Sequence, residues 1–275
     1  MPFVTTSRGR FFFRQALGEE PTLIFMHGNL GTSRWWRPVL NLLPTGWRGL
    51  AYDAIGFGYS ELGEQAESVE RYGIAAQVQD LAAFADAITD VPFHLVAHSN
   101  ATAAAVEYTL AYPKRVATLT LVGPVPASGT RTPPEAYPLL ERLPGDPELL
   151  RQAIAASAPA FTPEDFDIEQ LVEDARRTSP VALVASARAL DAWQPGPRLR
   201  QLTLPVLLVR GERDIMLDEQ EAHATLLAIP GAGNLEVLKR VGHSPMLEAP
   251  LAFANTLIRF VAEDWEAFAE VRSQE

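Results

Sequence analysis

Cysteine is absent from the 275-residue sequence. Its absence excludes disulfide bonds, thiolate metal ligands and a cysteine nucleophile, and it is most simply reconciled with a reducing compartment. Long apolar runs are absent too: nothing approaches the roughly 20 apolar residues that cross a bilayer, and the N-terminal residues lack the apolar stretch of a signal peptide. We therefore expect a cytoplasmic protein with no membrane-spanning segment and no export signal.

Basic residues are few. The chain has 23 lysines and arginines against 34 aspartates and glutamates, a formal net charge of −11, which repels phosphate backbones and anionic membrane surfaces. The five histidines show no metal-ligand spacing with carboxylates, and the segment "GFGYSE" at 56–61 lacks the third glycine of a dinucleotide-binding loop. We expect neither nucleic acid nor a membrane as a partner, and neither a metal nor an organic cofactor.

The apolar residues fall into short runs that alternate with helix-length amphipathic segments. Strands that alternate with helices imply crossover connections and a mainly parallel sheet. Two further runs, "FVTT" and "GRFFFRQAL", flank a turn near the N-terminus and predict a hairpin that joins this sheet. The predicted sheet strands are residues 22–26, 48–52, 93–97, 116–123, 205–211 and 235–239.

One region interrupts the alternation. From Gly123 the chain passes through a proline-dense stretch, "GPVPASGTRTPPEAYP", which suits neither a strand nor a helix interior, and then through several helical segments. We interpret residues 125–198 as a helical insertion between two strands. Residues 1–124 and 199–275 then form the core of one α/β domain.

The stretch "FHLVAHSNATAAAVEY" changes from an apolar strand to an alanine-rich helix at Ser99. A serine at such a junction is commonly no more than a helix N-cap. Here the pattern small-His-Ser-Asn-small between strand and helix is that of a nucleophile elbow, which needs small residues two positions either side of the serine because two backbones meet there. Ala97 and Ala101 meet that requirement, so Ser99 is a candidate nucleophile.

A serine nucleophile needs a general base oriented by an acid. His243 lies on a glycine-containing loop after the last predicted strand, and Asp214 follows the preceding strand by a tight turn. Glu212 and Asp218 are neighbouring alternatives for the acid. A tetrahedral oxyanion also needs preorganised donors, and we expect the backbone N–H groups of Asn100, after the nucleophile, and of Asn29, after "HG", to supply them.

These motifs together resemble the α/β-hydrolase fold superfamily. The "HG" loop, "YDAIGFGYS", the Ser99 elbow, "GERD" and "GHSPMLEAP" stand in that family's order over nearly the whole chain. The resemblance implies an α/β fold: a mainly parallel, eight-stranded twisted sheet flanked by helices, with residues 125–198 as a helical cap that roofs the active site. The chain departs from the family at the elbow, where Ala97, Ala101 and Thr102 replace the usual glycines; we expect a slight displacement there.

A serine nucleophile implies acyl transfer. We expect a carboxylesterase-like serine hydrolase whose partner is a small or medium, largely apolar carboxylic ester or related acyl substrate. Carbon–carbon bond hydrolysis, perhydrolysis, acyl transfer and cofactor-free oxygen chemistry on the same three residues stay open, as does a catalytically silent protein that binds a small ligand. The candidate pocket residues are Leu30, Trp35, Phe161, Trp193 and Met246.

Overall fold

The computed structural model describes residues 2–63, 66–161, 167–263 and 265. Its centre is an eight-stranded sheet of order β1-β2-β4-β3-β5-β6-β7-β8. The pairs β1–β2 and β2–β4 are antiparallel and the other pairs are parallel, so the expected mainly parallel sheet with an N-terminal hairpin is confirmed. The strands are β1 (Phe3–Thr6), β2 (Gly9–Ala16), β3 (Gly18–Met26), β4 (Gly46–Tyr52), β5 (Phe93–His98), β6 (Val116–Val122), β7 (Val206–Gly211) and β8 (Ala232–Leu238).

Strand β3 begins four residues before the predicted start at Thr22. The missed residues include Glu19, Glu20 and Pro21, which are residue types depleted in strands. The pairing of β3 with β4 shifts register between Gly18 and Thr22. This irregular pairing at the start of β3 tolerates the charges and the proline. The apolar pattern therefore did not predict that the strand begins at Gly18.

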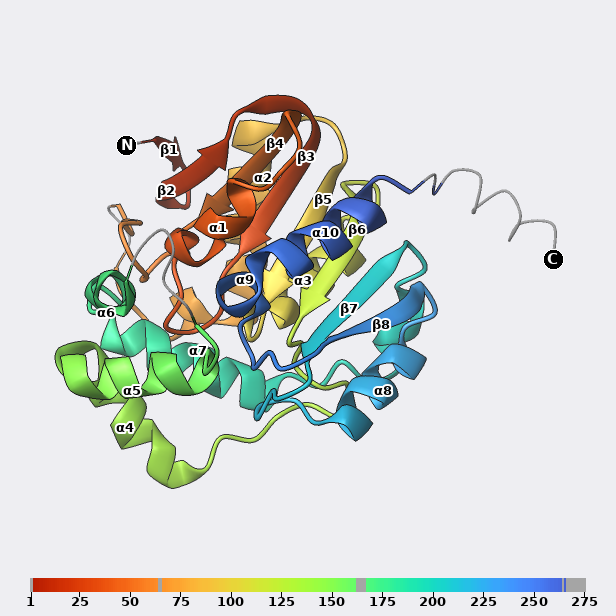
Figure 1. Ribbon diagram of the computed structural model, residues 1–275. Helices are drawn as coiled ribbons and strands as arrows, with labels where there is room; N and C mark the ends of the chain where they lie inside the picture. The colour runs from red at the N-terminus through yellow and green to blue at the C-terminus, as the bar shows by residue number, and fades with distance from the viewer. Residues whose placement is uncertain (1, 64–65, 162–166, 264, 266–275) are drawn as a thin grey trace.

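Helices cover both faces of the sheet (Figure 1). On one face α2 (Ile74–Ile88) packs against α3 (Ala101–Ala111), and on the other α1 (Arg37–Leu40) packs against α10 (Pro250–Val261). Each face has its own aromatic core: Tyr52 stacks on Phe84 at 4.6 Å between ring centroids, and Trp36 lies 5.1 Å from Phe25. Helices α8 (Glu219–Ala228) and α9 (Pro245–Glu248) complete the domain.

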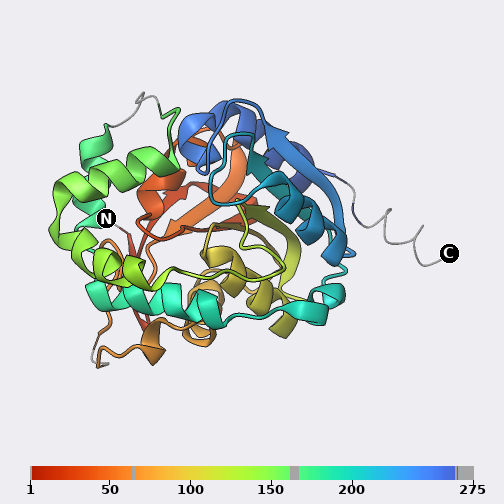
Figure 2. The ribbon, with the colours of Figure 1, turned by 90° about the horizontal axis from the view of Figure 1, so that it is seen from below.

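The segment between β6 and β7 is helical in the part that the structure describes. Its helices are α4 (Tyr137–Arg142), α5 (Pro147–Ser157), α6 (Ile168–Ala175) and α7 (Pro180–Ala192). They group at the end of the sheet to which the parallel strands point, and from below they curve around one side of it (Figure 2). Residues 162–166 of the predicted insertion lie outside the described residues.

Hydrogen bonds join this segment to loops at the carboxyl ends of the strands. Asp174 on α6 accepts from Arg34, in the loop after β3, and the N–H of Ser179 donates to the carbonyl of Gly56, in the loop after β4. Of the helices in the described residues, none is both long and apolar enough to traverse a bilayer.

Candidate active site

Ser99 occupies a strained turn between β5 and α3. Its φ of +56° lies in the left-handed region that non-glycine residues rarely adopt, and such a conformation costs on the order of 1–3 kcal/mol unless the surroundings hold it. The N–H of Ser99 donates to the carbonyl of Val122 on the next strand at 2.9 Å. Gly28 approaches closely, since a Cβ added there would lie 2.8 Å from the Ser99 Cβ. The strain and this close backbone approach are the geometry expected of an elbow that projects its hydroxyl.

The residues that replace the usual glycines fit inside this turn. Ala97 and Ala101 are buried in the core. Thr102 does more: its hydroxyl donates to the carbonyl of Ser99 at 2.6 Å and accepts from the N–H of Val125 at 3.0 Å. Thr102 therefore links the elbow to the first residues after β6 through two bonds that a glycine has no atoms to make.

Ser99, His243 and Asp214 form one chain of hydrogen bonds. His243 Nε2 lies 2.9 Å from Ser99 Oγ, and His243 Nδ1 lies 3.0 and 2.9 Å from the two carboxylate oxygens of Asp214. The other two acids predicted as alternatives are engaged elsewhere. Glu212 accepts from the N–H of Arg240, and Asp218 accepts from the N–H of Glu221 as the N-cap of α8. Only Asp214 of the three contacts His243.

The Asp214 carboxylate is held in its charged form. Burial alone would raise the pKa of Asp214, but its hydrogen bond to His243, the electrostatic attraction of that side chain and the N–H groups of Met216 and Leu217 together lower it. A carboxylate at this position orients the imidazole with Nδ1 protonated, which leaves Nε2 free to accept the proton of Ser99.

Two residues that the sequence did not single out hold the loop of His243. The buried Glu248 carboxylate accepts from the N–H groups of Gly242 at 2.8 Å and Ser244 at 3.0 Å, on either side of the histidine. His98 Nε2 donates to the carbonyl of His243 at 3.0 Å. Burial and the proximity of His243 lower the pKa of His98 to about 3, so its ring stays neutral.

Asn29, in the loop after β3, and Asn100, after Ser99, lie side by side. Their backbone N–H groups are the two expected oxyanion donors. The side-chain N–H of Asn100 donates to the side-chain oxygen of Asn29 at 2.7 Å. Asn100 is the N-cap residue of α3, at the helix end where the N–H groups lack helical acceptors and the helix dipole favours negative charge. His27 fixes the loop before Asn29: its Nε2 accepts from the N–H of Ala54, so Nδ1 carries the proton that is donated to the carbonyl of Gly28.

A family model described as the alpha/beta hydrolase family matches residues 23–256, most of the chain. The chain belongs to the alpha/beta hydrolase family. It is 24% identical to mouse monoacylglycerol lipase ABHD6 over 92% of this chain and 79% of that one. It is also 24% identical to the Escherichia coli 2-hydroxy-6-oxononadienedioate/2-hydroxy-6-oxononatrienedioate hydrolase, over 92% and 91% of the two chains. The solved esterase of Exiguobacterium antarcticum superposes with a TM-score of 0.80 at 19% identity, over 95% of this chain and 99% of the esterase.

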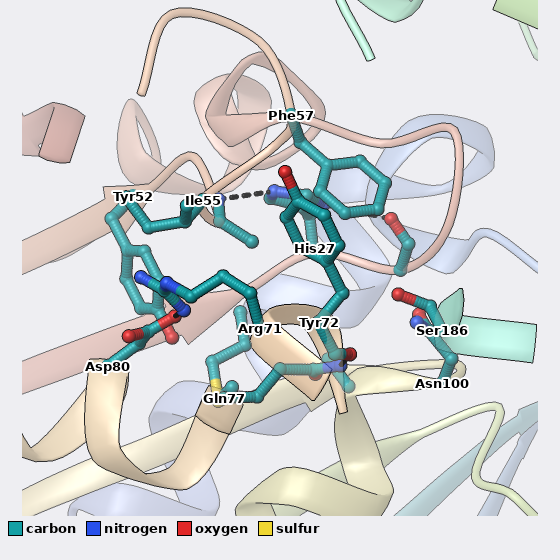
Figure 3. Close-up of a pocket in the computed structure, with 14 residues that line it drawn as sticks. His27, Tyr52, Ile55, Phe57, Arg71, Tyr72, Gln77, Asp80, Asn100 and Ser186 are labelled. Atoms are coloured by element: carbon teal, nitrogen blue, oxygen red, sulfur yellow. Dashed lines mark hydrogen bonds and ion pairs between the residues drawn. The ribbon is translucent and has the colours of Figure 1, made fainter. Parts of the chain in front are cut away.

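A pocket of this alpha/beta hydrolase, called here the α7 cavity, lies beside the loop of Gly28 and the start of α3 (Figure 3). Asn100 and Ser186 lie on one side of it, whereas Arg71, Asp80 and Tyr52 lie on the other. Its lining is Met26, His27, Gly28, Tyr52, Ala54, Ile55, Phe57, Arg71, Tyr72, Gln77, Asp80, Asn100, Ala101 and Ser186.

None of the five predicted pocket residues lines the α7 cavity. Trp35 and Met246 are buried in the hydrophobic core, and the indole N–H of Trp193 donates to Glu107 at 2.8 Å. Leu30 and Phe161 are half-buried and pack against the core. The residues that do line the cavity come from β3, β4 and the loops after them, from the 3₁₀ turn of Arg71 and Tyr72, and from α2, α7 and the start of α3. Their convergence has no local sequence signal.

Proposed function

We propose that this alpha/beta hydrolase is a serine hydrolase that cleaves a small or medium, largely apolar carboxylic ester or related acyl compound through an acyl-enzyme on Ser99. One observation carries the proposal: the continuous hydrogen bonding from Ser99 Oγ through His243 to Asp214. A serine hydroxyl is a weak nucleophile at neutral pH, and an imidazole in contact with it on one side and with a carboxylate on the other activates it.

In the proposed reaction Ser99 Oγ attacks the substrate carbonyl carbon while its proton passes to His243 Nε2. The negative oxygen that forms is received by the backbone N–H groups of Asn29 and Asn100, donors of a kind worth about 2.7–4 kcal/mol each in mutational studies. Asp214 stabilises the imidazolium. His243 then returns the proton to the leaving alcohol oxygen as the carbon–oxygen bond breaks, and an acyl ester remains on Ser99.

Water resolves the acyl-enzyme by the same steps. His243 Nε2 takes a proton from the water, the resulting hydroxide adds to the ester carbon, and the tetrahedral adduct collapses to the carboxylic acid with the proton returned to Ser99 Oγ. We further propose that residues 125–198 act as the cap over this site. The hydrogen bond from the N–H of Ala160 to Glu248, beside His243, supports that role because it ties the segment to the histidine loop.

Covalent labelling tests the nucleophile directly. A fluorophosphonate probe should add to the peptide that contains Ser99, p-nitrophenyl acetate should give a burst of nitrophenol, and Ser99→Ala should lose both. Ser128, an exposed serine, provides the matched control, since Ser128→Ala should react as the wild type does. Ester turnover that survives Ser99→Ala unchanged would overturn the proposal, and a wild-type protein that resists the probe would favour a catalytically silent binding protein.

Carbon–carbon bond hydrolysis is the second candidate, because the E. coli relative is a hydrolase of 2-hydroxy-6-oxo dienedioates. A keto acid of that type presents a carbonyl to the same three residues. Turnover of such a substrate with no measurable ester turnover would favour this second candidate over the first.

A further inference from the structure

We propose that the α7 cavity is the subsite for the acyl chain and that it restricts the enzyme to short acyl groups. This inference rests on the proposed ester hydrolysis at Ser99 and adds the class of substrate: esters of short, apolar carboxylic acids. Three observations carry it, namely the place of the cavity relative to His243, the chemistry of its walls and its size.

The place of the cavity follows from the sheet order. β5, which leads into Ser99, stands between β3 and β6. Asp214 and His243 follow β7 and β8 on one side of it, whereas Met26 and Tyr52 of the cavity wall end β3 and β4 on the other. The cavity and the imidazole therefore lie on opposite sides of the nucleophile.

That arrangement decides which part of the substrate points into the cavity. The tetrahedral carbon formed at Ser99 has four substituents: Oγ, the oxyanion, the leaving oxygen and the acyl chain. The leaving oxygen must face His243 to receive its proton, and the oxyanion must face the N–H groups of Asn29 and Asn100. The acyl chain is the substituent left to point away from His243, toward the cavity, whose lining includes two neighbours of Ser99: Asn100, the next residue, and Gly28, where an added Cβ would lie 2.8 Å from the Ser99 Cβ.

The walls of the cavity suit an apolar chain and limit its length. Ile55, Phe57 and Ala101 provide apolar surface. The side of the cavity away from Asn100 holds Arg71 (Figure 3), whose Nη1 lies 2.7 Å from an Asp80 carboxylate oxygen, with 6% and 7% of the two side chains exposed. Displacing one partner of a buried ion pair leaves an uncompensated charge and is strongly unfavourable. A long acyl chain could extend beyond this ion pair only by separating Arg71 from Asp80, which is energetically unfavourable.

The size of the cavity gives the limit. It leaves about 20 Å³ for the centre of a water-sized group, and since one water needs about 10–15 Å³ on that measure, the space admits on the order of one or two carbons beyond the ester carbonyl. Ser186 of α7 forms part of the wall, so the segment between β6 and β7 helps to set this limit.

The test is a chain-length series of p-nitrophenyl esters (acetate, butyrate, octanoate) with kcat/KM for each. In a hydrophobic pocket a methylene that fits or fails to fit changes the rate by about tenfold or more. We therefore expect wild-type kcat/KM to fall at least about tenfold from butyrate to octanoate. Met26→Ala, which enlarges the cavity, should reduce the butyrate-to-octanoate ratio of kcat/KM by about fivefold or more.

Met246→Ala is the matched control, because Met246 is a buried methionine of the core that does not line the cavity. It removes the same atoms and should leave the butyrate-to-octanoate ratio unchanged. The ratio is measured within one variant, so a general loss of stability or activity cancels.

Ser186→Leu supplies an independent reading if Met26→Ala does not fold, since a larger side chain at the wall should reduce butyrate turnover relative to acetate. Equal wild-type turnover of butyrate and octanoate, or equal ratios in Met26→Ala and Met246→Ala, would overturn the inference and leave ester hydrolysis standing. Folded wild-type protein that hydrolyses none of the three esters would overturn both proposals.

Discussion

Replacing Thr102 by valine tests how the elbow is held. Thr102 is 1% exposed, and its hydroxyl lies between the carbonyl of Ser99 and the N–H of Val125. Valine keeps the branched shape of threonine and removes the hydroxyl. The substitution therefore deletes two hydrogen bonds at the elbow while it changes little of the packing around them.

The two lost bonds have unequal costs. The Ser99 carbonyl keeps a partner, because it also accepts from the N–H of Thr102 at 2.9 Å. Deleting the bond from the hydroxyl to this carbonyl should therefore cost near the typical net value of one hydrogen bond, about 1 kcal/mol. The N–H of Val125 loses the hydroxyl acceptor, and an unsatisfied buried donor costs about 1–3 kcal/mol. Since Val125 is only half-buried, we take the lower end and expect the free energy of unfolding to fall by about 2 kcal/mol in total.

Thr109 provides a matched control on the same helix. It is also 1% exposed, but its hydroxyl makes one bond, to the carbonyl of Ala105 four residues earlier at 2.7 Å. Thr109→Val should therefore cost about 1 kcal/mol or less. Of the two variants, only Thr102→Val should also lower kcat, because the strained Ser99 turn relaxes. We expect a fall of about tenfold, which corresponds to about 1.4 kcal/mol of lost transition-state stabilisation.

Urea unfolding gives the free energies, and pre-steady-state hydrolysis of p-nitrophenyl acetate gives the acylation rate. Equal stability and equal activity of Thr102→Val and Thr109→Val would refute this role of Thr102, because the bond to Val125 would then contribute nothing to the elbow.

Three further perturbations address the candidate site and the stability of the fold. Asp214→Asn should lower ester kcat by about 10⁴-fold, since an amide holds the imidazole in the wrong tautomer; retention of a tenth of wild-type activity would contradict the assignment of the acid. Gly123→Ala should sharply reduce kcat, because its Cβ would lie 2.8 Å from the His243 ring, whereas Gly129→Ala, also at positive φ but distant from that histidine, should reduce stability without a comparable loss of kcat. Burial lowers the pKa of His94 to about 4. Because the unfolded chain binds a proton at this histidine from near pH 6.5, the free energy of unfolding should fall as the pH drops from about 6.5 to 4. His94→Asn should reduce this pH dependence, as measured by urea midpoints at pH 7 and pH 5.

Local pattern was enough to predict most of the fold. Each parallel strand contains a short apolar run, and the boundaries of β5, β6 and β7 agree with the predicted ones to within one residue. Ser99, Asp214 and His243 were each identifiable because a residue that follows a parallel strand sits at the edge where loops converge, so strand position and residue type suffice to nominate it. The starts of β3 and β8 were missed, because charged residues and a proline in β3, and a glycine and an asparagine in β8, occupy irregular pairings that lack an apolar pattern.

The tertiary structure decided what depends on residues far apart in the chain. Ser99 and His243 are 144 positions apart, and the choice of Asp214 over Glu212 and Asp218 follows from which carboxylate the packing of β7 and β8 carries to the imidazole. Glu248 could have been read from sequence only as one more acid near a helix end, yet its contacts with Gly242 and Ser244 follow from the fold of their loop.

The α7 cavity is the clearest case of this division. Its walls come from two strands, two core helices, two loops, the 3₁₀ turn of Arg71 and Tyr72, and α7, none of which carries a pattern that marks it as pocket-forming. A sequence determines which side chains a segment offers and which of them are apolar. The space left between segments depends on how closely they pack, and here that packing lined the α7 cavity with residues other than the five nominated from sequence.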